Sequence, residues 1–313
     1  MPFARMKMEI DKLSYSYKEG NHAVLNTVSF CIEDSFFSLG IAGRSGSGKT
    51  TLLKAIYGLL NIRSGQVRFN GERVEGPDQH LIPGHPKMKL IAQDFALLPD
   101  HTVEENIYTR LLAYTPEFRR AKADRLLQLC KIDHLRKEKP SALSGGQQQM
   151  LAISCALAEE PELLLLDEPF SHLDKLTQSE IMQYLRELRE ELGFSFIFVS
   201  HDAPDVLEVC DRILIMEKGK ILEQGDPLSL YFSPKHEYTA ALFGMYNKVG
   251  KQFIRPSSLR VTTEAHALFS GKVADSGFRG ESWWIKVRSG KKEMIYLSLN
   301  PPPAIGKLVH LKW

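Results

Sequence analysis

Several short apolar runs along the chain end in glycine or in polar residues. FFSLGIAG (36–43), LLLLDEP (163–169) and FSFIFVSHD (194–202) are of this kind. Continuous apolar runs of this length fit strands that are buried on both faces of a parallel sheet. Helical spacing in TLLKAIYGLL (51–60) and in the mixed-charge segment 176–192 predicts helices between these strands. The alternation predicts an α/β fold with functional groups at the carboxyl ends of the strands.

Two further segments change this pattern. Residues 103–160 look mostly helical and interrupt the strand pattern, which predicts an inserted helical subdomain at about 95–160. RILIMEKGKILEQG (212–225) predicts two strands around a tight Lys218-Gly219 turn. A short helix is expected at 236–244.

The pattern of apolar and polar residues changes again near the C-terminus. After Gly250 the chain consists of short strand-like runs separated by Gly, Ser and a cluster of prolines, as expected of a small all-β domain. Residues 248–313 carry 12 Lys and Arg against 4 Asp and Glu, and the rest of the chain carries 28 against 34. We therefore predict two domains, 1–245 and 246–313, and an anionic partner of the tail stays an open alternative.

The overall composition is that of a soluble globular protein, with 43% apolar and 25% charged residues. The start lacks the apolar core of a signal peptide, and no run of about 18 apolar residues occurs, so we expect a cytoplasmic chain without membrane spans. Its scattered cysteines are expected to be buried, reduced thiols: Cys31, Cys130, Cys155 and Cys210.

GRSGSGKT follows the first strand-like run and opens a helix, and it fits the phosphate-loop pattern G-x-x-x-x-G-K-[ST]. Glycines let backbone N–H groups close around phosphates. Lys49 would contact the β- and γ-phosphates, and the Thr50 hydroxyl would ligate Mg²⁺. The sequence therefore predicts a site for ATP and Mg²⁺ formed by Gly43, Ser45, Gly46, Ser47, Gly48, Lys49, Thr50 and Thr51.

A carboxylate pair ends the run LLLLDEP. Asp167 is placed to ligate the Mg²⁺, and Glu168 could orient or deprotonate the attacking water. The alternative is a pair that only caps the next turn, which Pro169 would favour. The phosphate loop upstream favours the catalytic interpretation.

Together these motifs resemble the ATPase subunit of ATP-binding cassette (ABC) transporters over about residues 7–245. LSGGQ (143–147) matches the signature motif of that family and precedes LLLLDEP in the family's order. The resemblance implies that Tyr17 stacks on adenine, that Gln93 contacts Mg²⁺ or water, that Asp174 ends the D-loop and that His201 is the switch histidine. In isolation, Tyr17, Gln93 and His201 could each be ordinary structural residues.

The resemblance also explains why one chain has two phosphate-facing motifs. In the family, ATP on the phosphate loop of one cassette is covered by the signature of a second cassette. Lys49, His201 and Ser144 would hold the γ-phosphate. Both halves are intact in this chain, which favours a homodimer. The signature residues expected to act in trans are Leu143, Ser144, Gly145, Gly146 and Gln147.

Two features resemble importer ATPases in particular: PSALSGGQ before the helix, and a tail that resembles an OB-type TOBE domain. This implies integral membrane permease subunits as partners, a solute-binding protein, and a peripheral place on the inner face of the cell membrane. The alternatives are an ATPase for export or for lipid or lipoprotein extraction, and a soluble ABC ATPase acting on nucleic acid through its basic tail. Nucleic acid is disfavoured, because the chain has neither tandem cassettes nor coiled-coil or zinc insertions.

The signature helix departs from the importer pattern at two positions. Met150 and Cys155 stand where arginines are usual. Ser144 and Gly146 are unchanged, so activity is expected to survive, and the lost charges are expected to alter contacts around the signature helix.

Overall fold

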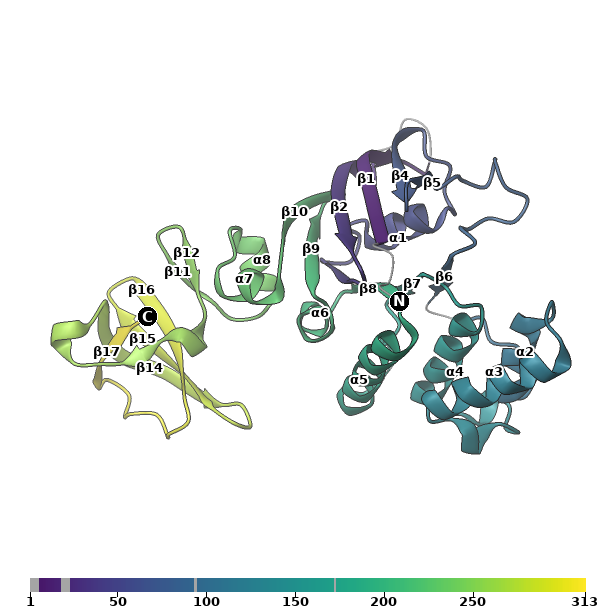
Figure 1. Cartoon of the computed structure of the whole chain (residues 1–313). Coiled ribbons are helices and arrows are strands. Elements are labelled where there is room, and N and C mark those ends of the chain that lie inside the picture. Colours follow the sequence, from purple (N-terminus) through teal and green to yellow (C-terminus); the bar gives the residue numbers. More distant parts are fainter. Residues whose placement is uncertain (1–5, 18–22, 93–94, 172) are drawn as a thin grey trace. The chain divides into compact units, whose positions relative to one another are not determined.

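The computed structural model describes residues 6–17, 23–92, 95–171 and 173–313. Their contacts divide the chain into two compact units, one that ends at Gln224 and one that spans Gly225–Trp313 (Figure 1). Each unit is described by itself.

The first unit is built around a mostly parallel sheet in the order β10-β9-β3-β8-β7-β6. All residues of β3 and β8 are buried, because helices and a second sheet cover both faces. This confirms the α/β fold that the apolar runs predict. The strands are β3 (Ser38–Ala42), β6 (Met88–Ile91), β7 (Leu163–Asp167), β8 (Ser195–Ser200), β9 (Arg212–Glu217) and β10 (Lys220–Gly225).

Three helices follow strands of this sheet. They are α1 (Lys49–Tyr57), α5 (Lys175–Leu192) and α6 (Ala203–Val209). β3 pairs in parallel with both β8 and β9, and β7 pairs in parallel with β6 and β8. The ends of β3, β7 and β8 therefore meet at one edge of the sheet, where α1, α5 and α6 begin.

A second, antiparallel sheet in the order β2-β1-β4-β5 was not predicted from the sequence. Its apolar side chains share one hydrophobic cluster with β3, β7 and α1. In β2, residues alternate between buried and exposed, so Phe30 and Ile32 enter the core while Cys31 faces outward. The strands are β1 (Met6–Tyr15), β2 (Leu25–Asp34), β4 (Ser64–Phe69) and β5 (Glu72–Arg73).

The prediction of buried cysteines was therefore wrong for Cys31, and Cys130, Cys155 and Cys210 are buried as expected. All four are free thiols. Burial raises the pKa of the Cys130 thiol to about 11 and that of Cys155 to about 12, so both are protonated at neutral pH.

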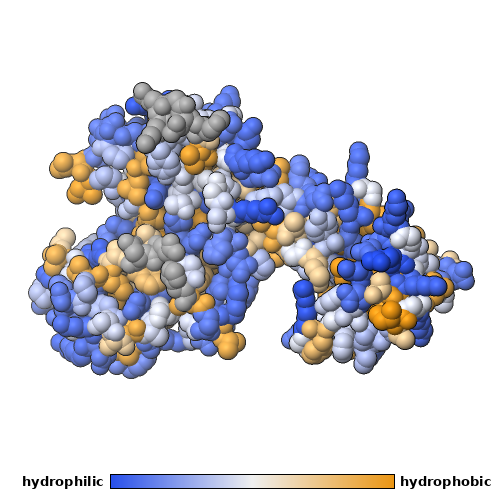
Figure 2. All heavy atoms as spheres, turned by 180° about the vertical axis from the view of Figure 1, so that it is seen from behind, coloured by the Kyte–Doolittle hydropathy of each residue, from blue (hydrophilic) through white to orange (hydrophobic). Residues whose placement is uncertain are grey.

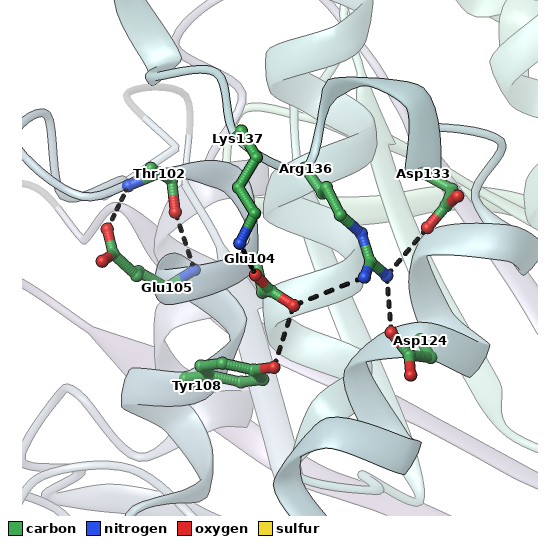
Figure 3. Close-up of polar contacts among 8 residues, drawn as sticks. All are labelled: Thr102, Glu104, Glu105, Tyr108, Asp124, Asp133, Arg136 and Lys137. Atoms are coloured by element: carbon green, nitrogen blue, oxygen red, sulfur yellow. Dashed lines mark hydrogen bonds and ion pairs between the residues drawn. The ribbon is translucent and has the colours of Figure 1, made fainter.

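The segment predicted to be helical contains α2 (Val103–Tyr108), α3 (Pro116–Leu129) and α4 (Gly145–Ala158), joined by short 3₁₀ turns at Thr109–Leu111, Asp133–Leu135 and Pro140–Ala142. Figure 3 shows its main polar cluster. The buried Glu104 carboxylate accepts hydrogen bonds from Lys137 Nζ (2.8 Å) and Tyr108 Oη (2.9 Å). Arg136 lies 3.6 Å from the same carboxylate and also pairs with Asp124. The cluster ties α2 and α3 to the segment that leads to α4.

The second unit begins with two short helices, α7 (Pro227–Phe232) and α8 (Glu237–Leu242), and a two-stranded sheet of β11 (Asn247–Val249) and β12 (Gln252–Ile254). A five-stranded sheet in the order β13-β17-β14-β15-β16 follows, and its described pairs are antiparallel. This all-β region agrees with the predicted OB-like fold. Its strands are β13 (Arg260–Val261), β14 (Phe269–Phe278), β15 (Trp283–Ser289), β16 (Lys292–Ser298) and β17 (Leu308–Lys312).

The contacts place the division at Gln224/Gly225, ahead of the predicted division at 245/246. Arg255, which is only 1% exposed, joins the residues on either side of the predicted division. Its guanidinium donates to the carbonyls of Tyr231 (2.7 Å), Ala240 (2.9 Å) and Met245 (3.1 Å) and lies over the Tyr231 ring. These contacts fasten α7 and α8 to the β-rich part of the second unit.

The surface in Figure 2 is mostly hydrophilic, with hydrophobic residues in small separate patches. Among the described residues, no helix combines the length and the apolar character needed to cross a membrane.

Candidate active site

The phosphate loop connects β3 to α1. Gly46 and Gly48 have φ angles of 77° and 102°, in the left-handed region where glycine is favoured. A Cβ at Gly48 would lie 2.8 Å from the Val24 carbonyl oxygen, so no larger residue fits without a shift. The loop and the start of α1 surround a cavity of about 190 Å³, lined by Val24, Ser45, Gly46, Gly48, Lys49, Thr50, Thr51 and Glu168.

Lys49 lines this cavity and is buried. Its Nζ donates to the carbonyls of Gly43 (2.8 Å) and Arg44 (3.2 Å). Burial lowers its pKa, and the charges of Glu168 and Asp167 oppose that shift. Carbonyl oxygens orient the ammonium without neutralising it, so its charge is available to an anion. The buried Ser47 hydroxyl has no partner among the described residues and is a further group that a ligand could satisfy.

A hydroxyl and a carboxylate meet next to Lys49. Thr50 Oγ1 donates to Asp167 Oδ1 at 2.9 Å, which joins the start of α1 to the end of β7. Burial raises the pKa of Asp167, and the Thr50 hydrogen bond opposes the rise. Both groups offer oxygen ligands, which Mg²⁺ prefers, and Mg²⁺ commonly takes its remaining ligands from water and phosphate. The two side chains thus fit a nucleotide-bound Mg²⁺.

Glu168 and His201 lie side by side across the carboxyl edge of the sheet. His201 Nδ1 is 3.0 Å from Glu168 Oε2. Glu168 has a φ of 48°, which is unusual for a residue with a side chain, and its N–H donates to the Val199 carbonyl at 3.0 Å. This backbone conformation accompanies a carboxylate that lines the phosphate cavity. The predicted pair of general base and switch histidine is therefore in contact.

The aromatic residue predicted to stack on adenine also contacts the loop. Tyr17 Oη is 3.1 Å from Thr51 Oγ1, and its ring packs edge-on against Tyr15. Tyr17 is 56% exposed and lines a second cavity of about 520 Å³ together with Asn61 and Arg63. An exposed ring beside the phosphate loop is available for stacking. Gln93, the other residue predicted to touch Mg²⁺ or water, lies outside the described residues.

The signature motif forms the beginning of α4. Ser144 is the N-cap residue, and its hydroxyl and backbone N–H exchange hydrogen bonds with Gln147 (3.4 and 2.9 Å). Leu143 is buried beneath this turn, while Ser144 and Gly145 are exposed. The described lining of the phosphate cavity includes none of the five signature residues. Within one chain, the structure therefore does not bring together the two motifs that are predicted to face phosphate.

Asp174 caps α5 by accepting from the N–H groups of Leu176 and Thr177, both at 3.1 Å, and from the Thr177 hydroxyl at 2.7 Å. The backbone hydrogen bond from Thr177 is the main cause that lowers the pKa of Asp174. Thr177 also limits the signature helix, because a Cβ at Gly146 would lie 2.5 Å from Thr177 Cγ2. Sequence reasoning missed Thr177, although a Thr three residues after an N-cap Asp is a recognisable local signal.

The two departures from the importer pattern are not at the surface. Met150 is 5% exposed and Cys155 4% exposed, both within α4. Any contacts that these two residues alter around the signature helix are therefore contacts with other buried side chains.

These features define a P-loop nucleotide hydrolase whose predicted catalytic groups lie at the carboxyl edge of a parallel sheet. The family described as ABC transporter matches residues 25–171. Spermidine/putrescine import ATP-binding protein PotA of Bacillus cereus is 32% identical over 309 residues, which cover 94% of this chain and 93% of that protein. The chain therefore belongs to the ABC transporter family, as an ATP-binding cassette that hydrolyses ATP.

Other relatives extend the comparison. PotA of Pseudomonas fluorescens is 39% identical over 244 residues, covering 77% of this chain and 66% of that protein. Sulfate/thiosulfate import ATP-binding protein CysA of Vibrio cholerae is 33% identical over 281 residues, covering 84% of this chain and 73% of that protein.

Solved structures of two cassettes are similar in fold. CbiO1 of Clostridium perfringens, part of the transporter complex cbiONQ, superposes with a TM-score of 0.66 at 29% identity, covering 71% of this chain and 89% of that one. The cassette MJ0796, a dimer bound to ADP and Pi in a post-hydrolysis state, superposes with a TM-score of 0.60 at 29% identity, covering 70% and 98%.

Proposed function

We propose that the chain uses ATP hydrolysis to drive solute import through integral membrane permease subunits. It would work as one of two identical cassettes in a head-to-tail dimer. The main support for a dimer is the separation of the phosphate loop and the signature motif within one chain. The described lining of the phosphate cavity includes none of the signature residues. The relatives named as import proteins for spermidine/putrescine and for sulfate/thiosulfate support the direction of transport.

Each predicted site residue has a role in this proposal. Lys49 would hold the β- and γ-phosphates, and Tyr17 would stack on the adenine. Thr50 and Asp167 would ligate Mg²⁺, with Gln93 as a further contact. The bound ion would neutralise developing charge on the phosphates.

The remaining groups act on the water and on the dimer interface. Glu168 would accept a proton from the attacking water, and His201, 3.0 Å away, would hold the γ-phosphate. Ser144 and Gly146 of the partner cassette would close the site from the other side. Asp174 would hold the D-loop at the interface. Opening after hydrolysis would pass motion to the permease.

The proposed place of the chain is the cytoplasmic face of the membrane, held there by the permease. A separate solute-binding protein would deliver the cargo. The β-rich part of the C-terminal unit resembles a TOBE domain, and its five-stranded sheet supports that assignment. Spermidine, putrescine, sulfate and thiosulfate are the first solutes to test, because they appear in the names of the relatives.

The test is ATP-dependent uptake by proteoliposomes that contain the full chain and its copurified membrane subunits. We expect the wild-type complex to accumulate one of these labelled solutes and Lys49→Ala to abolish uptake. Lys87→Ala is the matched control, because Lys87 is a half-exposed lysine paired with Glu162 outside the phosphate cavity. ATP-driven efflux in place of uptake, or uptake that survives Lys49→Ala, would refute the proposal.

A further inference from the structure

The segment that connects β7 to α5 is held at both ends by the end of β8 and the turn that follows it. That turn runs from Ser200 to Asp205 and carries His201. At the first end of the segment, Glu168 contacts His201 with its carboxylate and Val199 with its backbone N–H, both at 3.0 Å. The second end is held by Lys175, the first residue of α5.

Lys175 bridges two carboxylates of the turn. Its Nζ lies 2.6 Å from Asp202 Oδ2 and 3.1 Å from Asp205 Oδ1. Asp205 is buried in the first turn of α6, and its other oxygen accepts from Ser200 Oγ at 3.2 Å. Ser200 Oγ in turn accepts from the Asp202 N–H at 3.0 Å. Both neighbours of His201 in the chain thus belong to one hydrogen-bonded network that ends on Lys175.

On its other side, Lys175 adjoins the contact between α5 and the signature helix. Asp174, directly before it, caps α5 and accepts from the Thr177 hydroxyl. Thr177 packs so closely on α4 that Gly146 leaves no room for a Cβ. Lys175 is therefore two residues from Thr177, which packs on the signature helix, and itself contacts the turn that carries His201.

We propose that Lys175 is a positioning residue that ties the D-loop end of α5 to the turn of His201, so that a displacement of the D-loop moves His201 relative to Glu168. The inference rests on the proposed roles of His201 and Glu168. Lys175 is 70% exposed, and an exposed ion pair adds little to fold stability. The effect of the tie is therefore on the geometry of the site, and through it on turnover.

The experiment compares the full chain with Lys175→Met, Lys175→Arg and His201→Ala in a steady-state ATPase assay with Mg-ATP. We expect Lys175→Met to lower kcat by about fivefold and to leave KM for ATP within about twofold, because the ion pairs lie outside the binding cavity. Lys175→Arg keeps the charge and should restore kcat to within about twofold of wild type. The unfolding midpoint of Lys175→Met should stay within about 2 °C of wild type.

Lys87→Met is the matched control, since it removes a half-exposed lysine that pairs with Glu162 at 2.8 Å outside the phosphate cavity, and it should leave kcat unchanged. If His201→Ala retains wild-type turnover, the proposed roles of the site are wrong. If His201→Ala is inactive while Lys175→Met turns over like wild type, or Lys175→Arg fails to rescue, only the role of Lys175 is overturned. A kcat loss equal in Lys87→Met and Lys175→Met would overturn it as well.

Discussion

Gly146→Ala tests whether close packing on α5 sets the position of the signature helix. The added Cβ would lie 2.5 Å from Thr177 Cγ2 and 3.5 Å from Ile181 Cδ1. Carbon atoms pack at about 3.5–4.0 Å, so Thr177 or the start of α4 must move by about 1 Å. Thr177 cannot rotate away freely, because its hydroxyl and N–H are both bound to Asp174.

A shift of about 1 Å in a group that positions substrate can cost about 100-fold in rate. We therefore expect Gly146→Ala to lower kcat by about 10- to 100-fold in a phosphate-release assay at saturating Mg-ATP. Thr177→Ser removes Cγ2 and keeps the hydroxyl that donates to Asp174. Alone it should change kcat by less than about twofold, and in the double variant it should restore kcat to within about threefold of wild type.

The double variant decides between two explanations. If Gly146→Ala acts through the contact with Thr177, removing the methyl group relieves it. If the new Cβ instead obstructs the phosphates directly, Thr177→Ser changes nothing. A double variant as slow as Gly146→Ala would therefore refute the packing explanation.

Three further predictions follow from burial and charge. Glu168→Gln should bind ATP normally and accumulate as a dimer in gel filtration while kcat falls by at least about 100-fold, and near-normal hydrolysis would remove Glu168 from its role. Met150→Arg buries an unpaired charge and should destabilise the fold by about 3 kcal/mol or more, whereas Met150→Leu should stay within about 1.5 kcal/mol of wild type. The ATP affinity of the folded fraction should not change. Equal unfolding midpoints for the two variants would contradict this prediction. Burial opposes ionisation of Glu104, but hydrogen bonds from Lys137 and Tyr108 outweigh it and lower its pKa below 4.5. The stabilisation of about 1–2 kcal/mol from the ionised carboxylate is then complete above pH 4.5 and is lost as pH falls through the folded pKa. The unfolding midpoint of Glu104→Gln should therefore lie further below that of wild type at pH 7 than at pH 4, and an equal difference at both pH values would contradict this prediction.

The sequence predicts the parts of the fold whose signal is local. β3, β7 and β8 are continuous apolar runs, and each ends in the residues that form the site. The antiparallel sheet was missed because its strands alternate, as in β2, and gave no continuous run. Its apolar face becomes visible only when it packs on α1 and β3.

The contact-based division at Gln224/Gly225 differs from the predicted one for a related reason. Arg255 is a type of residue that is almost never buried without a partner, so no sequence pattern indicates that it is 1% exposed. Its partners are backbone carbonyls of residues 231–245. Every residue has such a carbonyl, so the sequence does not indicate which ones will accept a hydrogen bond. The contacts of Lys175 with Asp202 and Asp205 were missed likewise, because they join residues 27 and 30 positions apart.

The signature helix offers hydrogen-bond donors for which the described part of its own chain shows no acceptor. Its capping box occupies the Ser144 hydroxyl oxygen as an acceptor, which leaves the hydroxyl proton to donate. The N–H groups of Gly145 and Gly146 are in the first turn of α4, where no intrahelical acceptor exists. Three donors thus lie at the N-terminus of α4, the positive end of the helix, where Ser144 and Gly145 are exposed. The buried ammonium of Lys49 lies in a cavity whose described lining does not include these residues. A γ-phosphate held between two antiparallel copies of the chain would satisfy both sets of donors, which is why a homodimer explains the two motifs better than a monomer does.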